Sequence, residues 1–311
     1  MDKIKCLVTG GAGFIGSYIT DFLINKGYEV VIIDNLSTGK KENVNKNSKF
    51  YEVDITNDIN WIFQQEKPDI VIHTAAQVMV RTSIENPLFD AKINILGTIN
   101  VLEGCRKNKV KKIIYTSTGG ARVGEPEYLP VDEKHFLNPS SPYGISKHTA
   151  EHYIQIYNKL YDLDYLIYCF GNVYGPRDDP KCNRVTSIFA YQMLKGQIPV
   201  IFGDGNQTRD FIYVLDLAEF IVNNLEKKPK HKLFHLANGE KISVNEIFQI
   251  LKKLIGFKGE PNYVNEIKGE VRNIVLDTTL VQKELGWKPT YSFEDGLNEV
   301  VEWFKKQDLK I

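Results

Sequence analysis

Short apolar runs alternate along this chain with longer segments whose apolar residues recur at helical spacing. The runs occupy residues 4–8, 29–34, 49–53, 69–73, 111–116 and 164–170, and they predict buried β-strands. Most of them are separated by helix-like segments such as 14–26, 87–107 and 142–161. This alternation predicts an α/β protein with a doubly wound parallel sheet, the Rossmann architecture.

The regular alternation ends after Asn172, where loops rich in Gly, Pro and Asp follow at 175–180 and 202–206. We therefore expect residues 1–172 to form a Rossmann domain and residues 173–311 to form a smaller C-terminal domain that binds the substrate. The segment 212–237 is expected to return to the first domain.

Glycines cluster at the first predicted strand-to-helix turn, in the run Val8-Thr9-Gly10-Gly11-Ala12-Gly13-Phe14-Ile15-Gly16. Gly10 would permit a tight turn, Gly13 would let the backbone approach a pyrophosphate, and Gly16 would let the helix pack closely on the strand. The N–H groups at the helix start, at Phe14 and Ile15, would face the phosphates. Glycine turns also occur for structural reasons alone, so the assignment depends on its context.

That context is an acidic residue, Asp34, which ends the second predicted strand about twenty residues further on. A carboxylate at this position accepts hydrogen bonds from ribose hydroxyls and would repel a 2′-phosphate, so the sequence favours NAD over NADP. Lys40 and Lys41 could accommodate such a phosphate, although two lysines in a polar loop are typical of a solvated surface.

A tyrosine and a lysine lie four residues apart at Tyr143 and Lys147, just after Pro142. This spacing places both on one face of a helix that the proline opens. An ammonium beside a phenol favours the phenolate, and such a tyrosine can exchange a proton with a sugar hydroxyl while a hydride moves to or from nicotinamide. The pair is common on helix surfaces, but its position after the fifth strand of a nucleotide-binding sheet indicates catalysis.

Hydroxyl side chains follow that fifth strand at Ser117 and Thr118. The carboxyl ends of parallel strands line the crevice where ligands bind in such sheets. Thr118 could therefore hydrogen-bond the reacting oxygen, and Ser117 could contact the cofactor or share that task. An ordinary Ser/Thr turn is the alternative.

Composition excludes other classes of function. Lys plus Arg (39) balances Asp plus Glu (39) in the 311 residues, so no long-range field favours nucleic acid or an anionic membrane. The four cysteines lack C-x-x-C spacing, and no signal-like or membrane-length apolar run is present, so we expect a soluble cytoplasmic protein with reduced thiols. His148 and His152 share a helix face without a third ligand, and no metal site is predicted.

The chain resembles the extended short-chain dehydrogenase/reductases that act on nucleotide sugars, and within them the UDP-glucose 4-epimerases. The resemblance covers nearly the whole sequence. It rests on these segments: 9–16, Asp34-Asn35-Leu36-Ser37-Thr38-Gly39, Val53-Asp54, His73-Thr74-Ala75-Ala76-Gln77, Asn94 with Gly97-Thr98, Ser117-Thr118-Gly119-Gly120, Tyr143 with Lys147, 172–177, and 202–205 leading to Arg209-Asp210.

The resemblance implies a set of ligand contacts in this chain. Asp34, Asn35, Ser37, Thr38 and Gly39 would hold the adenosine ribose, Asp54 and Ile55 would flank the adenine, and Ala75, Ala76, Gln77, Asn94, Ser117, Tyr143, Lys147 and Phe170 would line the rest of the cofactor. Asn172, Arg209 and Arg272 would bind the uridine diphosphate, for which an arginine fork is well suited. Thr118 and Tyr143 would contact the sugar.

The resemblance also implies a mechanism. NAD stays bound, Tyr143 removes the proton of the sugar C4 hydroxyl, and hydride passes to the nicotinamide. The 4-keto sugar then turns over and takes the hydride back on its other face. A homodimer is expected, because the exposed faces of the helices at 94–107 and 143–160 could pair with a second subunit, although both helices could simply cover the sheet.

The sequence departs from the family pattern where substrate should bind. Arg122-Val123-Gly124 stands in place of Val-Tyr-Gly, Cys169 in place of an arginine, 181–184 in place of a glycine-rich segment, and Ile267 in place of an arginine whose contact Arg184 could take over. Ile274 is smaller than the tyrosine of some relatives, which favours tolerance of a bulkier sugar. The sugar itself could be a hexose, an N-acetylhexosamine or a uronate.

Other functions fit parts of the pattern. A 4,6-dehydratase or a decarboxylase of the same fold would have carboxylates just after the Thr/Ser position, where this chain has Gly119 and Gly120. A 4-reductase would generally use NADPH. A non-catalytic NAD-binding regulator would need the glycine turn but not Tyr143 and Lys147.

Overall fold

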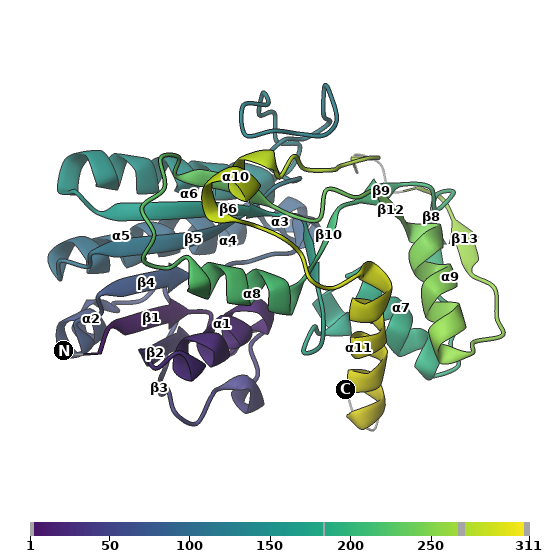
Figure 1. The fold of residues 1–311 in the computed structure, drawn as a ribbon, viewed down its shortest axis with the longest axis horizontal. Coiled ribbons are helices and arrows are strands. Elements are labelled where there is room, and N and C mark those ends of the chain that lie inside the picture. Colours follow the sequence, from purple (N-terminus) through teal and green to yellow (C-terminus); the bar gives the residue numbers. More distant parts are fainter. Residues whose placement is uncertain (1–2, 183, 267–270, 308–311) are drawn as a thin grey trace. The chain divides into compact units, whose positions relative to one another are not determined.

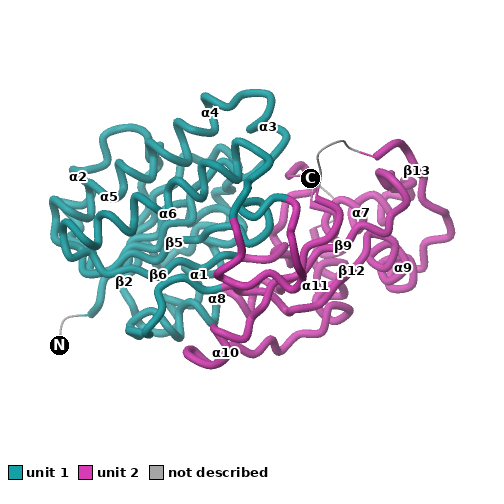
Figure 2. The backbone as a smooth tube through the Cα atoms, turned by 90° about the horizontal axis from the view of Figure 1, so that it is seen from above, with its two compact units in different colours: residues 1–124, 137–169, 218–234 teal, residues 125–136, 170–217, 235–311 magenta. Residues whose placement is uncertain are grey.

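The computed structural model describes residues 3–182, 184–266 and 271–307. The chain divides into two compact units, coloured separately in Figure 2. The first contains residues 1–124, 137–169 and 218–234, and the second contains residues 125–136, 170–217 and 235–311. The assignment of residues 173–311 to a substrate domain stays a prediction.

A seven-stranded sheet forms the centre of the first unit, with the strand order β11-β6-β5-β4-β1-β2-β3 (Figure 1). β1 pairs in parallel with both β2 and β4, so the order reverses at β1. This confirms the predicted doubly wound sheet, in which ligands bind where the order reverses. The strands are β1 (Lys5–Thr9), β2 (Glu29–Asp34), β3 (Lys49–Glu52), β4 (Ile70–His73), β5 (Lys112–Thr118), β6 (Asp164–Phe170) and β11 (Leu233–Leu236).

Helices cover this sheet because alternate strand residues are buried on its two faces. One face packs Leu7, Val71, Ile113 and Ile167 against α2, α5 and α6. The helical segments are α1 (Phe14–Asn25), α2 (Asn60–Glu66), α3 (Val80–Glu85), α4 (Pro87–Ala91), α5 (Thr98–Lys107), α6 (Pro142–Tyr161) and α8 (Val214–Asn223), with a 3₁₀ turn η1 (Lys41–Asn43) and a π-helical turn η2 (Lys92–Gly97). The predicted helix over 87–107 is thus α4, η2 and α5 in succession.

The start of α6 is fixed by local chemistry. Pro142 occupies the first turn, and the Ser141 side chain caps the helix by accepting the Gly144 N–H at 3.2 Å. A Cβ at Gly144 would lie 2.2 Å from the Ala121 carbonyl oxygen. Glycine therefore lets the first turn of α6 approach the loop that follows β5.

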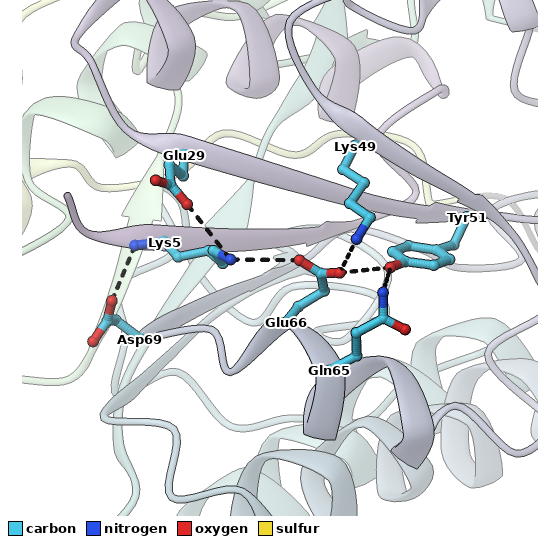
Figure 3. Close-up of polar contacts among 7 residues, drawn as sticks. All are labelled: Lys5, Glu29, Lys49, Tyr51, Gln65, Glu66 and Asp69. Atoms are coloured by element: carbon cyan, nitrogen blue, oxygen red, sulfur yellow. Dashed lines mark hydrogen bonds and ion pairs between the residues drawn. The ribbon is translucent and has the colours of Figure 1, made fainter. Parts of the chain in front are cut away.

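Charged side chains gather around Glu66 at the amino edge of the sheet, where the parallel strands begin (Figure 3). Its carboxylate is paired with Lys49, lies 3.4 Å from Lys5 Nζ and accepts the Tyr51 hydroxyl at 2.5 Å. Lys5 also reaches Glu29, at 3.5 Å. Both lysines remain partly exposed, so solvent screens this cluster.

The second unit is built on three helices that pack together, α7 (Val185–Leu194), α9 (Val244–Ile255) and α11 (Phe293–Lys306). Among the described residues of this unit, three short strand pairs accompany them: β7–β10, β9–β12 and β8–β13. Their bounds are β7 (Asn172–Tyr174), β8 (Val200–Phe202), β9 (Thr208–Arg209), β10 (Phe211–Tyr213), β12 (Ile242–Ser243) and β13 (Asn262–Val264), with α10 (Thr279–Leu285) and a 3₁₀ turn η3 (Pro180–Cys182).

A buried carboxylate, Asp210, fastens three chain segments of the second unit. It accepts the N–H groups of Asn238 and Gly239 at 3.0 and 3.1 Å and that of Leu276 at 3.0 Å. Burial raises its pKa to about 7, against the opposing effect of these donors. Within the described ranges, no helix is long and apolar enough to cross a membrane.

Candidate active site

The glycine turn between β1 and α1 has the shape that a dinucleotide requires. Gly10 has φ +73°, and a Cβ at Gly16 would lie 2.2 Å from the Gly10 carbonyl oxygen. A Cβ at Gly13 would meet only that same oxygen, at 3.1 Å, and is otherwise in open space. The backbone at Gly10 and Gly16 therefore packs tightly against the protein, whereas the space beside Gly13 is open. Gly13 is the N-cap residue of α1, and no side chain caps this helix.

Asp34 faces this turn from the end of β2. Its carboxylate accepts the Ala12 N–H at 3.0 Å and the Leu36 N–H at 2.8 Å. Burial raises the pKa of Asp34, and these N–H groups partly offset that effect. A Cβ at Gly39 would lie 2.8 Å from Asp34 Oδ1, so Gly39 packs directly on the carboxylate. The lone pairs that these contacts do not use leave capacity for ribose hydroxyls.

The other predicted adenosine contacts lie next to Asp34. Asn35 Nδ2 donates to Asp54 at 2.8 Å, and Asn35 Oδ1 accepts the Ser37 N–H at 3.0 Å. Asn35, Ser37 and Thr38 are exposed, whereas Ile55 is buried. The structure thus brings the residues predicted to hold adenosine into one loop region of the first unit.

A buried histidine that the sequence analysis did not assign, His73, links this turn to η2 and α5. Thr98 donates to the Asn94 carbonyl at 2.7 Å, so its oxygen accepts from His73 Nε2 at 2.9 Å. His73 Nδ1 then accepts from Thr9 Oγ1 at 2.7 Å, which assigns the Nε2–H tautomer. Burial lowers the pKa of His73 to about 3, so the ring is neutral.

Asn94 braces the loop that carries Ala75, Ala76 and Gln77. Its amide oxygen accepts the Gln77 N–H and its amide nitrogen donates to the Gln77 carbonyl, both at 2.9 Å. The same nitrogen lies 3.2 Å from Ser146 Oγ, which donates to the Tyr143 carbonyl at 3.0 Å. Asn94 therefore connects the predicted cofactor loop with the first turn of α6.

Tyr143 and Lys147 lie one turn apart on α6, the former half-buried and the latter buried. Lys147 Nζ donates to the Thr116 carbonyl at 2.7 Å and stands 4.2 Å from the centre of the Tyr115 ring. Burial lowers the pKa of Lys147 to about 7, although the Glu151 carboxylate acts in the opposite direction. The amine is thus fixed against β5 and titrates near neutral pH.

Ser117 and Thr118 point to different surroundings at the end of β5. Ser117 is buried and donates its hydroxyl to Glu151 Oε1 at 2.5 Å, so its oxygen lone pairs, not its proton, remain for a ligand. Thr118 is half-buried and accepts the Ala121 N–H at 3.3 Å, so its hydroxyl proton can be given to a substrate oxygen. Phe170 ends β6 and is buried.

The residues predicted to bind the diphosphate are linked through backbone contacts in the second unit. Asn172 on β7 pairs with Phe211 on β10, two residues beyond Arg209. Arg209 Nη1 donates to the Arg272 carbonyl at 3.2 Å, and Arg272 Nη2 donates to Asp204 at 2.7 Å. The Arg272 guanidinium, which is half-exposed, lowers the pKa of Asp204 to about 2.

The structure describes some of the positions near these residues at which the sequence departs from the family pattern. Arg184 is paired with the buried carboxylate of Asp178, so its guanidinium is directed at a protein partner. Ile267 and Asn183 lie outside the described residues. Ile274 is buried, and its N–H donates to the Thr208 carbonyl at 3.3 Å.

The residues of the first unit fit an NAD molecule on this structure's own features. The open side of Gly13, the uncapped start of α1 and the acceptor at Asp34 match a pyrophosphate and a ribose diol. A missed residue is Glu151, which holds Ser117. Its signal was an acidic residue four positions after Lys147 on the same helix face.

Comparisons with known proteins agree on the family to which this chain is similar. Residues 6–237 match the model of the NAD dependent epimerase/dehydratase family. A putative UDP-glucose 4-epimerase of Methanocaldococcus jannaschii is 50% identical over 97% of this chain and 99% of its own length. A UDP-glucuronate 4-epimerase of Thermodesulfobacterium geofontis is 38% identical, with 96% of each chain covered.

Among solved structures, the UDP-glucose 4-epimerase of Thermotoga maritima with UDP-glucose superposes with a TM-score of 0.95. It is 42% identical and covers 98% of this chain and 99% of its own. With the glycine turn, Asp34 and the Tyr143–Lys147 helix in place, the chain belongs to the NAD dependent epimerase/dehydratase family of extended short-chain dehydrogenase/reductases.

Proposed function

We propose that this protein is an NAD-dependent 4-epimerase of nucleotide sugars and that it interconverts UDP-glucose and UDP-galactose. The observation that carries the proposal is the end of β5, where Lys147 is fixed to the Thr116 carbonyl one helical turn from Tyr143. This arrangement supplies a base and a nearby cation without a second acid. It suits oxidation and reduction at one carbon, and it does not suit the elimination that a dehydratase carries out.

Tyr143, Lys147 and Thr118 each have a defined task in the proposed reaction. Tyr143 takes the proton of the C4 hydroxyl and later returns one, and the Lys147 ammonium stabilises its phenolate. Thr118 donates its hydroxyl proton to the same sugar oxygen, since its contact with the Ala121 N–H uses a lone pair and leaves that proton available. NAD, when bound, supplies reversible hydride transfer at C4.

The absence of carboxylates beside Thr118 in the sequence weighs against the rival reactions. A dehydratase or a decarboxylase of this fold needs an acid or base there, and Gly119 and Gly120 have no side chain to provide one. A 4-reductase would generally use NADPH, against which the Asp34 carboxylate acts by repelling a 2′-phosphate. A non-catalytic NAD-binding regulator would not need the fixed Lys147.

Asn172, Arg209 and Arg272 support a uridine diphosphate as the shared part of the substrate, because Asn172 pairs with the strand just after Arg209 and Arg209 contacts the Arg272 backbone. Guanidinium groups hold phosphates in fork geometry. The sugar is the less constrained part. The relative named UDP-glucuronate 4-epimerase and the small side chain of Ile274 make UDP-glucuronate and UDP-N-acetylglucosamine the substrates to test beside UDP-glucose.

We also propose a homodimer formed through α4, η2 and α6. Large apolar side chains on these segments are exposed, and their exposed fractions exceed one half at Leu88, Leu96, Ile145 and Leu160. Light scattering should give twice the chain mass, and Leu96→Glu with Leu160→Glu should give the monomer. A monomeric wild-type protein would contradict this proposal.

A substrate panel tests the activity. The purified protein, without added coenzyme, should convert UDP-glucose to UDP-galactose, and the panel should include UDP-N-acetylglucosamine and UDP-glucuronate. Strict dependence on NADPH, or release of a 4-keto-6-deoxy sugar, would overturn the epimerase proposal. Activity on a uronate or an N-acetylated sugar alone would keep the reaction and replace the sugar.

A further inference from the structure

A buried carboxylate, Glu151, lies one helical turn beyond Lys147 on α6, and only 1% of the residue is exposed. Its two oxygens are shared among donors from different segments. Oε1 accepts the Ser117 hydroxyl at 2.5 Å, and Oε2 accepts Arg122 Nη1 at 2.7 Å and lies 3.1 Å from His148 Nδ1. The carboxylate therefore joins β5, the loop after β5 and α6 at the point where the proposed chemistry takes place.

The Arg122 guanidinium belongs to a residue that is itself buried, with 2% exposed. Burial would raise the pKa of Glu151, but the hydrogen bonds from His148, Ser117 and Arg122, together with the charge of Arg122, outweigh burial and lower it. Glu151 is thus an anion in the interior. A buried ion pair of this kind is costly to break, because removal of one partner leaves a charge without compensation.

A second position faces the same carboxylate. The thiol of Cys169, on β6, is 3.8 Å from Glu151 Oε1 and is buried. A long cationic side chain starting from β6 would therefore reach the carboxylate that Arg122 now reaches from the loop after β5.

We propose that the Arg122–Glu151 pair positions the catalytic end of β5 and α6, and that Arg122 supplies the cation that this buried carboxylate requires. Glu151 holds Ser117 by its hydroxyl and fixes the turn of α6 that carries Lys147 and Tyr143. Arg122 and Glu151 are positioning residues, since they act through these side chains. The catalytic part of the inference rests on the proposed function, and the ion-pair part does not.

Four variants test the inference: Arg122→Val, Cys169→Arg, the double variant, and Cys169→Ser. Arg122→Val should lower kcat about tenfold or more and leave KM for the UDP-sugar nearly unchanged, because the uridine diphosphate ligands lie in the second unit. The double variant should recover kcat to within a few-fold of the wild type. Cys169→Ser should be close to the wild type, because it keeps Arg122.

A matched control is Arg106→Val on α5. Arg106 makes a fork to Glu103 with distances of 2.8 and 2.7 Å, but unlike Arg122 it is partly exposed. Its loss should leave kcat unchanged. An equal fall of kcat in Arg106→Val and Arg122→Val would contradict the proposal, since it would show a general effect of removing an arginine.

Urea unfolding of the same variants separates the inference from the proposed function. The transition midpoint should fall in Arg122→Val and return in the double variant, whether or not any sugar is a substrate. Independent, additive effects of the two substitutions would overturn the ion-pair proposal. Restored stability without restored kcat would overturn only the positioning of the catalytic residues.

The test remains decisive if Arg122→Val does not fold. The double variant would then have to fold where the single variant does not, and Arg122→Lys, which keeps the charge, would have to fold as well. Failure of the double variant to fold would contradict the proposal.

Discussion

Two buried carboxylates stand at opposite edges of the same sheet and have opposite surroundings. Glu66, at the amino edge, has a side chain that is 5% exposed, but its cations Lys5 and Lys49 are 27% and 51% exposed. The side chain of Glu151, at the carboxyl edge, is 2% exposed, and that of its cation Arg122 is 3% exposed. Water therefore screens the charges of Glu66 and its two lysines, whereas the Arg122–Glu151 pair is enclosed by protein.

The difference follows from what each edge does. In a parallel sheet, ligands bind at the carboxyl ends of the strands, so side chains there must be held in place without solvent. The amino edge has only to close the sheet, and flexible lysines are sufficient. An ion pair near the surface is worth little, whereas a buried one becomes costly when half of it is lost.

The largest expected effect comes from removing the Tyr143 hydroxyl, and the matched change at the amino edge removes the Tyr51 hydroxyl. Tyr143→Phe removes the proposed base and should lower turnover by roughly 10²–10⁴-fold, the usual range for general acid–base catalysis. Tyr51→Phe removes the phenol on Glu66 and should leave turnover unchanged. Steady-state rates and bound NAD content measure both. Survival of turnover in Tyr143→Phe would show that the proton assignment is wrong.

The next largest effect is expected on the free energy of unfolding, when the cation beside each carboxylate is removed. Arg122→Met leaves Glu151 as an enclosed anion and should reduce the free energy of unfolding by about 3–5 kcal/mol. Lys5→Met at the amino edge should cost about 1 kcal/mol or less. Urea unfolding at pH 7 measures both values. Equal losses at the two edges would remove the distinction between them.

His73 lies at the end of β4, and its burial should make folding stability depend on pH. Its pKa is lowered from 6.5 to about 3 by burial, so between these values the unfolded chain binds a proton that the folded chain does not. Folding stability should therefore fall as the pH falls through this window, by about 1.4 kcal/mol per pH unit from this group. His73→Asn should have a shallower dependence. Identical slopes for the two proteins would contradict a neutral, buried His73.

The smallest effect is expected at an exposed pair in the second unit, Arg272–Asp204. Asp204→Asn should free the guanidinium for a phosphate and lower the Kd for UDP roughly two- to fivefold, in keeping with the strength of surface pairs. Calorimetric titration with UDP measures the change. Weaker binding in this variant would show that Asp204 orients Arg272 instead of competing for it.

Local signals predicted much of this structure. The Ser141-Pro142 start of α6, the strand ends and the glycine turn depend on residues close together in the sequence, and the structure contains each of them. Boundaries were less accurate: β5 extends to Thr118, because Ser117 and Thr118 remain in the sheet instead of turning.

The partners of the site residues could not be predicted in the same way. Glu151 meets Ser117 across 34 positions and Arg122 across 29, and His73 meets Thr9 across 64. Such contacts exist only once the sheet and α6 have packed together. The spacing of Tyr143 and Lys147 predicted that they share one helix face, whereas the buried groups around them could not be predicted from spacing.

The central claim is that one hydride leaves C4 of the sugar and returns to it while Tyr143 moves the proton. UDP-glucose deuterated at C4 tests it most directly, with the purified protein in ordinary water and no added coenzyme. The account predicts UDP-galactose that retains its deuterium at C4. Loss of the label to solvent, or a product that requires added NADPH, would contradict it.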